Sequence, residues 1–341
     1  MFRNTAIEQG PIRPPNEAES LLLRVTRNCP WNRCLFCPVY KGKKFSRRSL
    51  EEIKGDIDQL SGTLPRGNYN VFLQDADSLI LKTEDLVEII NYLYQKLPGV
   101  SRVTSYARSR TLARKSVEEL TRLKNAGLTR VHVGLESGCD EVLDFVKKGV
   151  TSAEQIEAGK RVKEAGLLLS HYIILGLGGK ERWKEHAQDT AAVINAVNPD
   201  FIRVRTLTLR PNAPMAEEYH NGNFTHMEEE EMVEEEKLLV ENLSNITSTL
   251  YSDHILNLLE GVQGTFPHDK EAMLKEIEEF RSLSSEEKTL FIVGRRAGIL
   301  RYPADRHEPH LKKRVELILS DLEKQGVSPK DFLREMMLRY I

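Results

Sequence analysis

Residues 21–38 read LLLRVTRNCPWNRCLFCP and join a strand-like apolar run to a loop that carries three cysteines. The run at residues 21–25 is short and rich in leucine and valine, as buried strands are. Cys29, Cys34 and Cys37 follow it with the spacing C-x4-C-x2-C. A strand that precedes three thiols on one short loop predicts an α/β fold in which a metal centre can follow the first strand.

The same strand-and-helix pattern continues along the chain. Strand-like runs recur at residues 71–73, 103–106, 131–133, 169–175 and 201–209. Amphipathic stretches lie between them, at residues 50–60, 83–97, 117–126, 140–148, 152–165 and 180–197. This alternation indicates parallel βαβ units. It leaves two architectures open, a doubly wound sheet and a barrel, and both bind ligands at the carboxyl ends of their strands.

The sequence changes character near residue 212. Pro211 and Pro214 interrupt the strand pattern, and the segment after them is predicted to be mostly helical. Residues 228–236 are very acidic, and we expect them to form a solvated face near a helix start, where the helix dipole favours glutamates. We therefore predict an N-terminal extension, a core and a helical region that covers the substrate, at residues 1–17, 18–212 and 213–341.

The composition argues against several classes of protein. Of the 341 residues, 40 % are hydrophobic and 29 % are charged, and no run of 18 apolar residues could form a membrane span. The N-terminus has no apolar signal segment, so we expect a cytoplasmic protein. A net charge of −2 argues against a nucleic-acid partner. Four cysteines in so long a chain argue against a disulfide framework.

Three kinds of site are open to the clustered cysteines. A structural zinc site usually has four ligands in two close pairs, but the remaining cysteine, Cys139, lies far downstream. Buried, inert thiols are the second alternative. An iron–sulfur cubane is the third, because thiolates are its standard ligands and three of them leave one iron open for chemistry. An enzyme hypothesis therefore stands beside that of a non-catalytic iron–sulfur or zinc protein with a structural or electron-transfer role.

Over about residues 18–210 the sequence resembles the radical SAM superfamily. Its usual C-x3-C-x2-C motif also follows the first strand; this chain has one more residue in the first interval and keeps an aromatic residue, Phe36, before the third cysteine. GLESGCDEVL, at residues 134–143, is similar to the fourth-strand motif of the coproporphyrinogen-dehydrogenase-like and methylthiotransferase-like branches. IILGLGG, at residues 173–179, is similar to the fifth-strand motif.

The resemblance implies a partial (β/α)6 barrel, similar to a TIM barrel, and an enzyme. Cys29, Cys34 and Cys37 would hold a [4Fe-4S] cluster, whose open iron binds the amino and carboxylate groups of S-adenosylmethionine (SAM). Reductive cleavage of SAM would give a 5′-deoxyadenosyl radical that abstracts hydrogen from the substrate. A reductant such as flavodoxin or ferredoxin would be a partner, and the substrate would be a small molecule or a protein.

The resemblance also implies SAM contacts at the ends of later strands. Gln74 and Asp75 stand where many members have Gly-Gly-Glu for the SAM amino group. Glu136 would accept hydrogen bonds from the ribose or the amino group, and Lys148 would bind the SAM carboxylate. The other implied contacts are Phe36, Ser137, Tyr172, Gly176 and Arg205. Structural roles are the alternatives, including a core position for Tyr172 and salt bridges for the two arginines of the sixth strand.

Other features leave the substrate unnamed. Cys139 is expected to be a small residue at a helix start, and His254 a structural histidine or a substrate ligand. With one cysteine outside the cluster, the sequence argues against enzymes that hold a second cluster by cysteines. A basic stretch could steer an anionic substrate or an acidic electron donor, or form a solvated loop. Its residues are Arg33, Lys41, Lys43, Lys44, Arg47 and Arg48.

Overall fold

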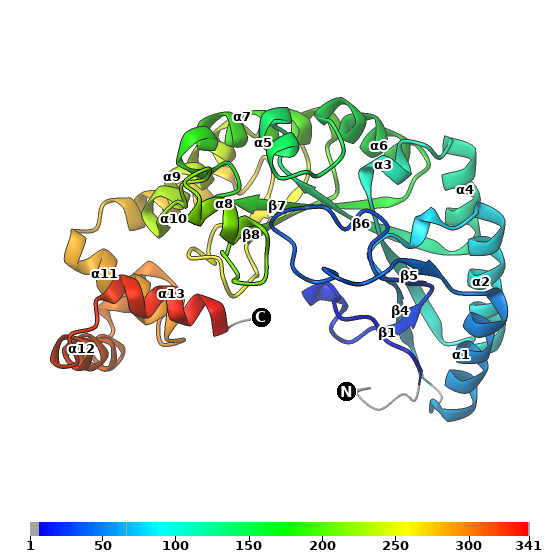
Figure 1. Cartoon of the computed structure of the whole chain (residues 1–341), viewed down its shortest axis with the longest axis horizontal. Coiled ribbons are helices and arrows are strands. Elements are labelled where there is room, and N and C mark those ends of the chain that lie inside the picture. The colour runs from blue at the N-terminus through cyan, green and yellow to red at the C-terminus, as the bar shows by residue number, and fades with distance from the viewer. Residues whose placement is uncertain (1–6, 66, 340–341) are drawn as a thin grey trace. The chain divides into compact units, whose positions relative to one another are not determined.

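A computed structural model describes residues 7–65 and 67–339 of the chain. Its main sheet has eight strands in the order β1-β4-β5-β6-β7-β8-β9-β10 (Figure 1). They are β1 (Leu21–Arg24), β4 (Tyr69–Gln74), β5 (Val100–Ala107), β6 (Leu128–Glu136), β7 (Leu168–Leu175), β8 (Phe201–Thr206), β9 (Thr249–Tyr251) and β10 (Gly264–Thr265). The first four pair in parallel, as do β8 and β9, whereas β10 is antiparallel to β9. The predicted α/β class, with a mostly parallel sheet and a helical C-terminal region, is confirmed.

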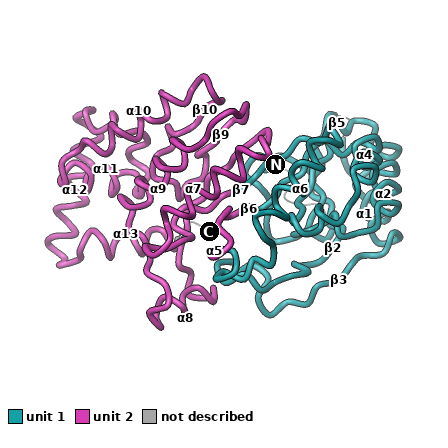
Figure 2. Tube along the Cα trace, turned by 90° about the horizontal axis from the view of Figure 1, so that it is seen from above, with its two compact units in different colours: residues 1–135, 143–172 teal, residues 136–142, 173–341 magenta. Residues whose placement is uncertain are grey.

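The chain divides into two compact units (Figure 2). Unit 1 comprises residues 1–135 and 143–172, and unit 2 comprises residues 136–142 and 173–341. Both β6 and β7 therefore begin in unit 1 and end in unit 2. The predicted division into an extension, a core and a helical region stays a prediction.

The helices of unit 1 begin where their sequences predict, apart from the short helix at residues 109–112, which the sequence pattern does not predict. They are α1 (Leu50–Thr63), α2 (Thr83–Lys96), α3 (Ser109–Leu112), α4 (Val117–Ala126) and α6 (Ser152–Glu164), with short 3-10 turns η1 (Pro15–Glu17) and η2 (Ser78–Ile80). Capping boxes, in which a Ser or Thr and a Glu satisfy each other's backbone N–H groups, start three of them. The pairs are Ser49 with Glu52 for α1, Ser116 with Glu119 for α4 and Thr151 with Glu154 for α6.

Helix α5 (Asp140–Phe145) ends earlier than the amphipathic stretch at residues 140–148 predicts. Lys147 has a φ of 55° and Gly149 a φ of 71°, so the chain turns out of the helical conformation. The carbonyl groups of residues 147–149 therefore have no helical partners. They accept hydrogen bonds from side chains of the candidate site instead.

Unit 2 adds two strands to the predicted helices. The helices are α7 (Gly179–Val197), α8 (Met215–His220), α9 (Glu229–Asn242), α10 (Lys270–Arg281), α11 (Ser285–Arg296), η3 (Pro303–His307), α12 (Pro309–Lys324) and α13 (Pro329–Arg339). Strands β9 and β10 are only three and two residues long, too short to show a period of two in the sequence.

The prediction of a solvated acidic face on residues 228–236 is wrong for two of its members. Glu235 and Glu236 are 1 % and 3 % exposed. They lie on the same side of α9 as the buried Met232, Leu239 and Val240, because these positions are three or four residues apart. Packing of the apolar side of the helix therefore carries both carboxyl groups into the interior.

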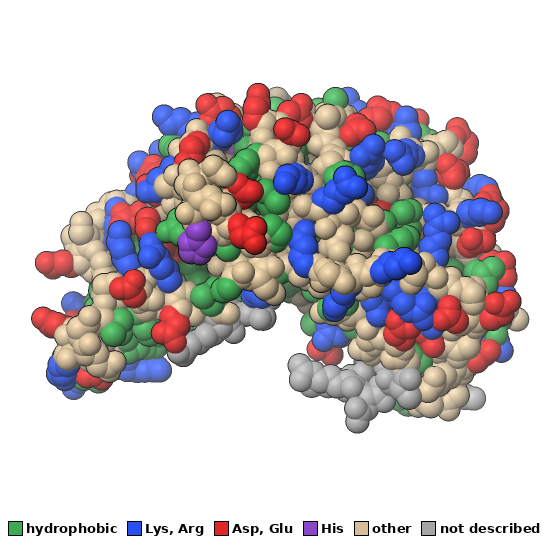
Figure 3. Space-filling view, viewed as in Figure 1, with side chains coloured by type: hydrophobic (Ala, Val, Ile, Leu, Met, Phe, Trp, Pro, Cys, Tyr) green, Lys and Arg blue, Asp and Glu red, His purple; other side chains and the backbone are tan. Residues whose placement is uncertain are grey.

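None of the described helices has the length and apolar character that a bilayer crossing requires. On the face of the molecule in Figure 3, basic and acidic side chains are interspersed. This mixture agrees with the small net charge of −2.

Candidate functional site

The loop that carries the three cysteines is closed at its base by a short antiparallel pair of strands. β2 (Thr26–Arg27) pairs with β3 (Ser46–Arg47), so residues 28–45 form one loop, called the Cys loop below. Asn28 and Asn32 adopt left-handed φ angles of 66° and 49° inside it. Asparagine tolerates this conformation better than most residues, which lets the loop fold back on itself.

The three thiols lie in one electrostatic neighbourhood. Cys29, Cys34 and Cys37 are half-buried free thiols, and the backbone N–H of Asn32 lies 3.4 Å from the Cys29 sulfur and donates to it. Burial, and then the charges of the Cys34 and Cys29 sulfurs, raise the pKa of the Cys37 thiol to about 11. Three thiolates this close repel one another unless cations lie among them. This donor set therefore fits a metal cluster with soft ligands.

The turn after α5 holds the Cys loop from one side. The backbone N–H of Leu35 donates to the carbonyl oxygen of Val146 at 2.9 Å, and the indole N–H of Trp31 donates to that of Lys147 at 2.7 Å. A Cβ atom at Gly149 would overlap the Trp31 ring, and its φ of 71° also favours glycine. Gly149 is thus the residue that lets the ring pack against this turn.

The same turn brings two predicted SAM contacts together. Arg108 and Arg110, before and within α3, donate to the carbonyl oxygens of Lys148 and Gly149 at 3.2 and 3.3 Å. The Lys148 ammonium then lies 5.7 Å from the centre of the Phe36 ring, a cation–π distance. Its charge also reaches the third cysteine, whose pKa it lowers against the effect of burial.

Gln74 and Asp75, at the end of β4, are buried and bonded to neighbouring parts of unit 1. The Gln74 side chain donates to the carbonyl oxygen of Ile12 at 2.7 Å. The Asp75 carboxylate accepts from Arg24 at 2.6 Å and from the backbone N–H of Asn28, the first residue of the Cys loop, at 2.9 Å. These contacts attach the start of the Cys loop to the end of β4.

Tyr172, another predicted SAM contact, belongs to a buried network of unit 1. Its hydroxyl lies 3.3 Å from Nδ1 of His132, whose Nε2 lies 3.2 Å from a carboxylate oxygen of Glu17. Ser20 donates to Glu17 at 2.5 Å, and Arg102 pairs with it at 3.0 Å. Although burial raises the pKa of Glu17, the hydrogen bonds from His132 and Ser20 and the charge of Arg102 lower it to about 2. Sequence reasoning missed Glu17.

In unit 2, the end of β6 is a tight turn. Glu136 has a φ of 65°, which is uncommon for a residue with a side chain. The backbone N–H of Gly138 donates to the hydroxyl of Thr190 at 2.8 Å, and a Cβ atom at Gly138 would overlap the backbone of Asp189. The glycine of the predicted motif is therefore required by its packing against α7.

A buried glutamate that sequence reasoning missed anchors the end of β7. The backbone N–H of Gly176, whose φ is 81°, donates to Glu235 at 2.8 Å. His186 lies 3.1 Å from the other oxygen of Glu235 and 2.8 Å from the Ser137 hydroxyl, so the network reaches the end of β6. Burial raises the pKa of Glu235 and of Glu236 to about 8 and lowers that of His186 to about 4. These groups are therefore uncharged at neutral pH.

The two arginines of the predicted sixth strand, Arg203 and Arg205, lie in β8. Arg203 and Arg205 both pair with Asp253, at 2.5 and 3.4 Å, which is the salt bridge that the sequence left as an alternative. Burial lowers the pKa of His254 to about 4, and its Nδ1 accepts from the backbone N–H of Leu256 at 3.3 Å. SAM contact by Arg205, like that by Glu136, Ser137 and Gly176, stays a prediction.

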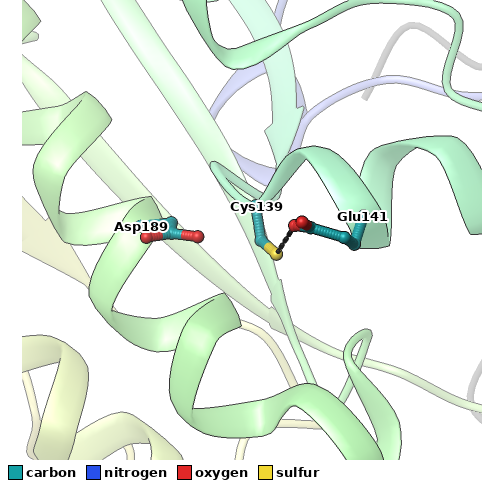
Figure 4. A group of neighbouring side chains, drawn as sticks. All are labelled: Cys139, Glu141 and Asp189. Carbon is teal, nitrogen blue, oxygen red and sulfur yellow. Dashed lines mark hydrogen bonds between the residues drawn. The ribbon is translucent and has the colours of Figure 1, made fainter.

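Cys139 differs from the three cysteines of the Cys loop in being fully buried. It is 1 % exposed, immediately precedes α5 and donates to Glu141 at 3.2 Å. Figure 4 shows Asp189 on α7 directed toward the same thiol. Burial raises the pKa of Cys139 to about 11, so it is a protonated hydrogen-bond donor and not a nucleophile at neutral pH.

The sequence is similar to a known protein family and to several known proteins. The model of the Radical SAM superfamily matches residues 23–190. An uncharacterized methyltransferase of Pyrococcus horikoshii is 26 % identical over 202 residues, which cover 58 % of this chain and 41 % of that protein. The tRNA-2-methylthio-N(6)-dimethylallyladenosine synthase of Bordetella avium is 25 % identical over 229 residues, covering 62 % and 46 %. The chain thus spans less than half the length of these relatives.

Two solved structures align with this chain at low sequence identity. Coproporphyrinogen III oxidase of Escherichia coli aligns with a TM-score of 0.47 and 15 % identity, over 58 % of this chain and 46 % of that one. Elp3 of Methanocaldococcus infernus aligns with a TM-score of 0.47 and 16 % identity, over 76 % and 63 %.

Proposed function

We propose that this protein is a radical SAM enzyme that cleaves SAM reductively. The match of residues 23–190 to the model of the radical SAM superfamily supports this proposal. The observation that carries the proposal is the closed Cys loop, on which Cys29, Cys34 and Cys37 present half-buried thiols in one neighbourhood. When bound, a [4Fe-4S] cluster and SAM supply a 5′-deoxyadenosyl radical, which abstracts hydrogen from a substrate.

The chain's own residues would bind and position these groups. The three thiolates would hold the cluster. Lys148 offers an ammonium for the SAM carboxylate, and the position of that ammonium over Phe36 keeps it beside the loop. Gln74 and Asp75 stay predicted SAM contacts, and their hydrogen bonds support a second task, which is to hold the start of the Cys loop in place.

A radical SAM enzyme also needs a one-electron reductant and a substrate. We propose flavodoxin or ferredoxin as the reductant and a small molecule or a protein as the substrate. Several matched relatives act on tRNA by their names, but the net charge of −2 gives this chain no general cationic surface of the kind that nucleic acids require.

Anaerobic reconstitution with iron and sulfide tests the proposal. We expect four irons per chain, an electron paramagnetic resonance signal that shifts when SAM is added, and release of 5′-deoxyadenosine. Replacement of any one of Cys29, Cys34 and Cys37 by alanine should abolish both the signal and the cleavage.

Cys139→Ala is the matched control, because Cys139 is a cysteine outside the Cys loop. It should keep its iron and its cleavage activity, and loss of iron from this variant would show that the ligand assignment is wrong. A cluster that assembles but neither responds to SAM nor cleaves it would favour the alternative, a non-catalytic iron–sulfur protein.

A further inference from the structure

Trp31 stands in the Cys loop, between the first two cysteines, and three guanidinium groups surround it. Arg33, Arg108 and Arg110 lie 5.0, 5.2 and 5.9 Å from its ring, each within cation–π range. Hydrogen bonds to the turn after α5 fix the Trp31 indole and two of these guanidiniums. An aromatic side chain and several positive charges are thus held together on the loop that carries the metal ligands.

An open groove of about 490 Å³ adjoins this tryptophan. Pro30 and Trp31 of the Cys loop line it, and so do Arg108, Arg110 and Arg114. Glu119 is the one carboxylate that lines it among the described residues, and Thr83 and Lys115 already bind that carboxylate. The groove therefore presents an excess of positive charge.

The arginines around Trp31 also differ from most other arginines of unit 1, because they form no ion pair with a described residue. Within the described part of the chain, no carboxylate forms an ion pair with Arg33, Arg108, Arg110 or Arg114, which we call the cationic rim. By contrast, most other arginines of the unit are paired. The pairs include Arg24 with Asp75, Arg27 with Glu8, Arg48 with Asp56, Arg102 with Glu17, Arg122 with Glu84 and Arg161 with Glu157. Like charges kept together without ion-pair partners favour an anionic partner.

We propose that the cationic rim and Trp31 form the docking surface for an acidic electron-donor protein. The inference rests on the proposed function, because it needs a cluster bound to the Cys loop. In the step, one electron leaves the reduced cofactor of the donor and enters the cluster, so that the donor is oxidised and the cluster reduced with no change of covalent bonds. Electron tunnelling weakens steeply with distance, so a donor must approach the Cys loop itself.

Charge complementarity selects an acidic protein as the occupant. Opposite charges steer two proteins into a docked orientation and raise their association rate. The rim is confined to the neighbourhood of Trp31, whereas an RNA would need phosphate contacts spread over a larger basic surface. An acidic protein of the flavodoxin kind needs only such a local patch, with an aromatic side chain at its centre to cover the edge of the cofactor.

The first arm of the test measures binding. Oxidised bacterial flavodoxin is titrated by calorimetry into the reconstituted protein at about 50 mM salt, where surface charges are weakly screened. The double variant R33E/R114E should bind it about 10-fold more weakly or worse, and added salt should reduce that difference. The control is R122E, which reverses the charge of one surface arginine of α4, as R114E does at one arginine of the rim, and should differ from the unmodified protein by less than about 2-fold.

The second arm compares two sources of electrons. SAM cleavage driven by reduced flavodoxin should fall about 10-fold in R33E/R114E, whereas cleavage driven by excess dithionite, which needs no docking, should not change. If iron content falls in the double variant, R114E alone replaces it, because Arg114 lies outside the Cys loop. Equal effects of R114E and R122E, or equal loss with both reductants at full iron content, would overturn the docking surface.

Transfer RNA is titrated in parallel. If R33E/R114E abolishes tRNA binding and leaves flavodoxin binding intact, the rim is an RNA site and the proposal is wrong. Failure of the unmodified protein to cleave SAM with dithionite would instead contradict the proposed function. That result is separate from the binding arm, which does not depend on catalysis.

Discussion

Glu17 in unit 1 and Glu235 in unit 2 are both buried, but at neutral pH Glu17 is charged and Glu235 is uncharged. Glu17 in unit 1 faces His132 and Arg102, and its pKa is lowered to about 2. Glu235 in unit 2 accepts from the backbone N–H of Gly176 but faces no charged partner among the described residues, and its pKa is raised to about 8. Burial alone therefore does not decide the charge of an interior carboxyl group; the number of hydrogen-bond donors and a cationic partner about 3 Å away do.

The same substitution in both units tests this contrast most strongly. At pH 7, Glu17→Gln should lower the free energy of unfolding by about 3–4 kcal/mol, because it leaves Arg102 and His132 without their anion. Glu235→Gln should not lower it and should raise it, since a neutral amide replaces a neutral acid of the same shape and the unfolded chain no longer gains free energy by ionising at this position. Urea denaturation measures both. Equal costs would mean that the two carboxyl groups share one charge state.

Acid titration gives the second test, and its sign follows from the lowered pKa of Glu17. The folded protein keeps this carboxylate charged down to about pH 2, whereas the unfolded chain takes up a proton near the ordinary value of 4.5. Its contribution is therefore present above pH 4.5 and is lost as the pH falls toward 2, by about 3 kcal/mol in all. Unfolding free energies at pH 5, 4 and 3 should fall less steeply in Glu17→Gln than in the unmodified protein.

The opposite slope is expected from unit 2. Because the pKa of Glu235 is raised to about 8, the folded protein binds a proton that the unfolded chain releases above pH 4.5. This contribution is full below pH 4.5 and is lost as the pH rises through 8, by about 4–5 kcal/mol in all. In Glu235→Gln the decline between pH 5.5 and 8.5 should be smaller. Glu236→Gln should act in the same direction, because the pKa of Glu236 is also about 8.

The two glutamates also show which parts of the molecule the sequence predicts. The α/β alternation and the spacing of Cys29, Cys34 and Cys37 are local patterns, and the confirmed fold class and the single Cys loop follow from them. Glu17 could not be predicted, because its partners His132 and Arg102 lie 115 and 85 positions away. Only contacts between distant segments identify such a residue.

The burial of Glu235 could have been predicted from the sequence, but its charge pointed to an exposed position. It lies three residues after Met232 and four before Leu239, both apolar, and a helix places these positions on one side. The density of glutamates in this stretch favoured a solvated face. The periodicity of the apolar neighbours is therefore a better guide to burial in α9 than the charge of the residue itself.

The smallest expected effect is the difference in unfolding free energy between the loss of a serine hydrogen bond to Glu17 and the loss of one to His186. Ser20 donates to the charged Glu17 at 2.5 Å, whereas the Ser137 hydroxyl lies 2.8 Å from the neutral His186. Charge-assisted hydrogen bonds are about twice as strong as neutral ones. In the apoprotein at pH 7, Ser20→Ala should therefore cost about 2 kcal/mol and Ser137→Ala about 1 kcal/mol of unfolding free energy. At pH 5 the difference should persist, because Glu17 stays charged and His186 stays neutral there; its loss at pH 5 would mean that Glu17 is already protonated at that pH.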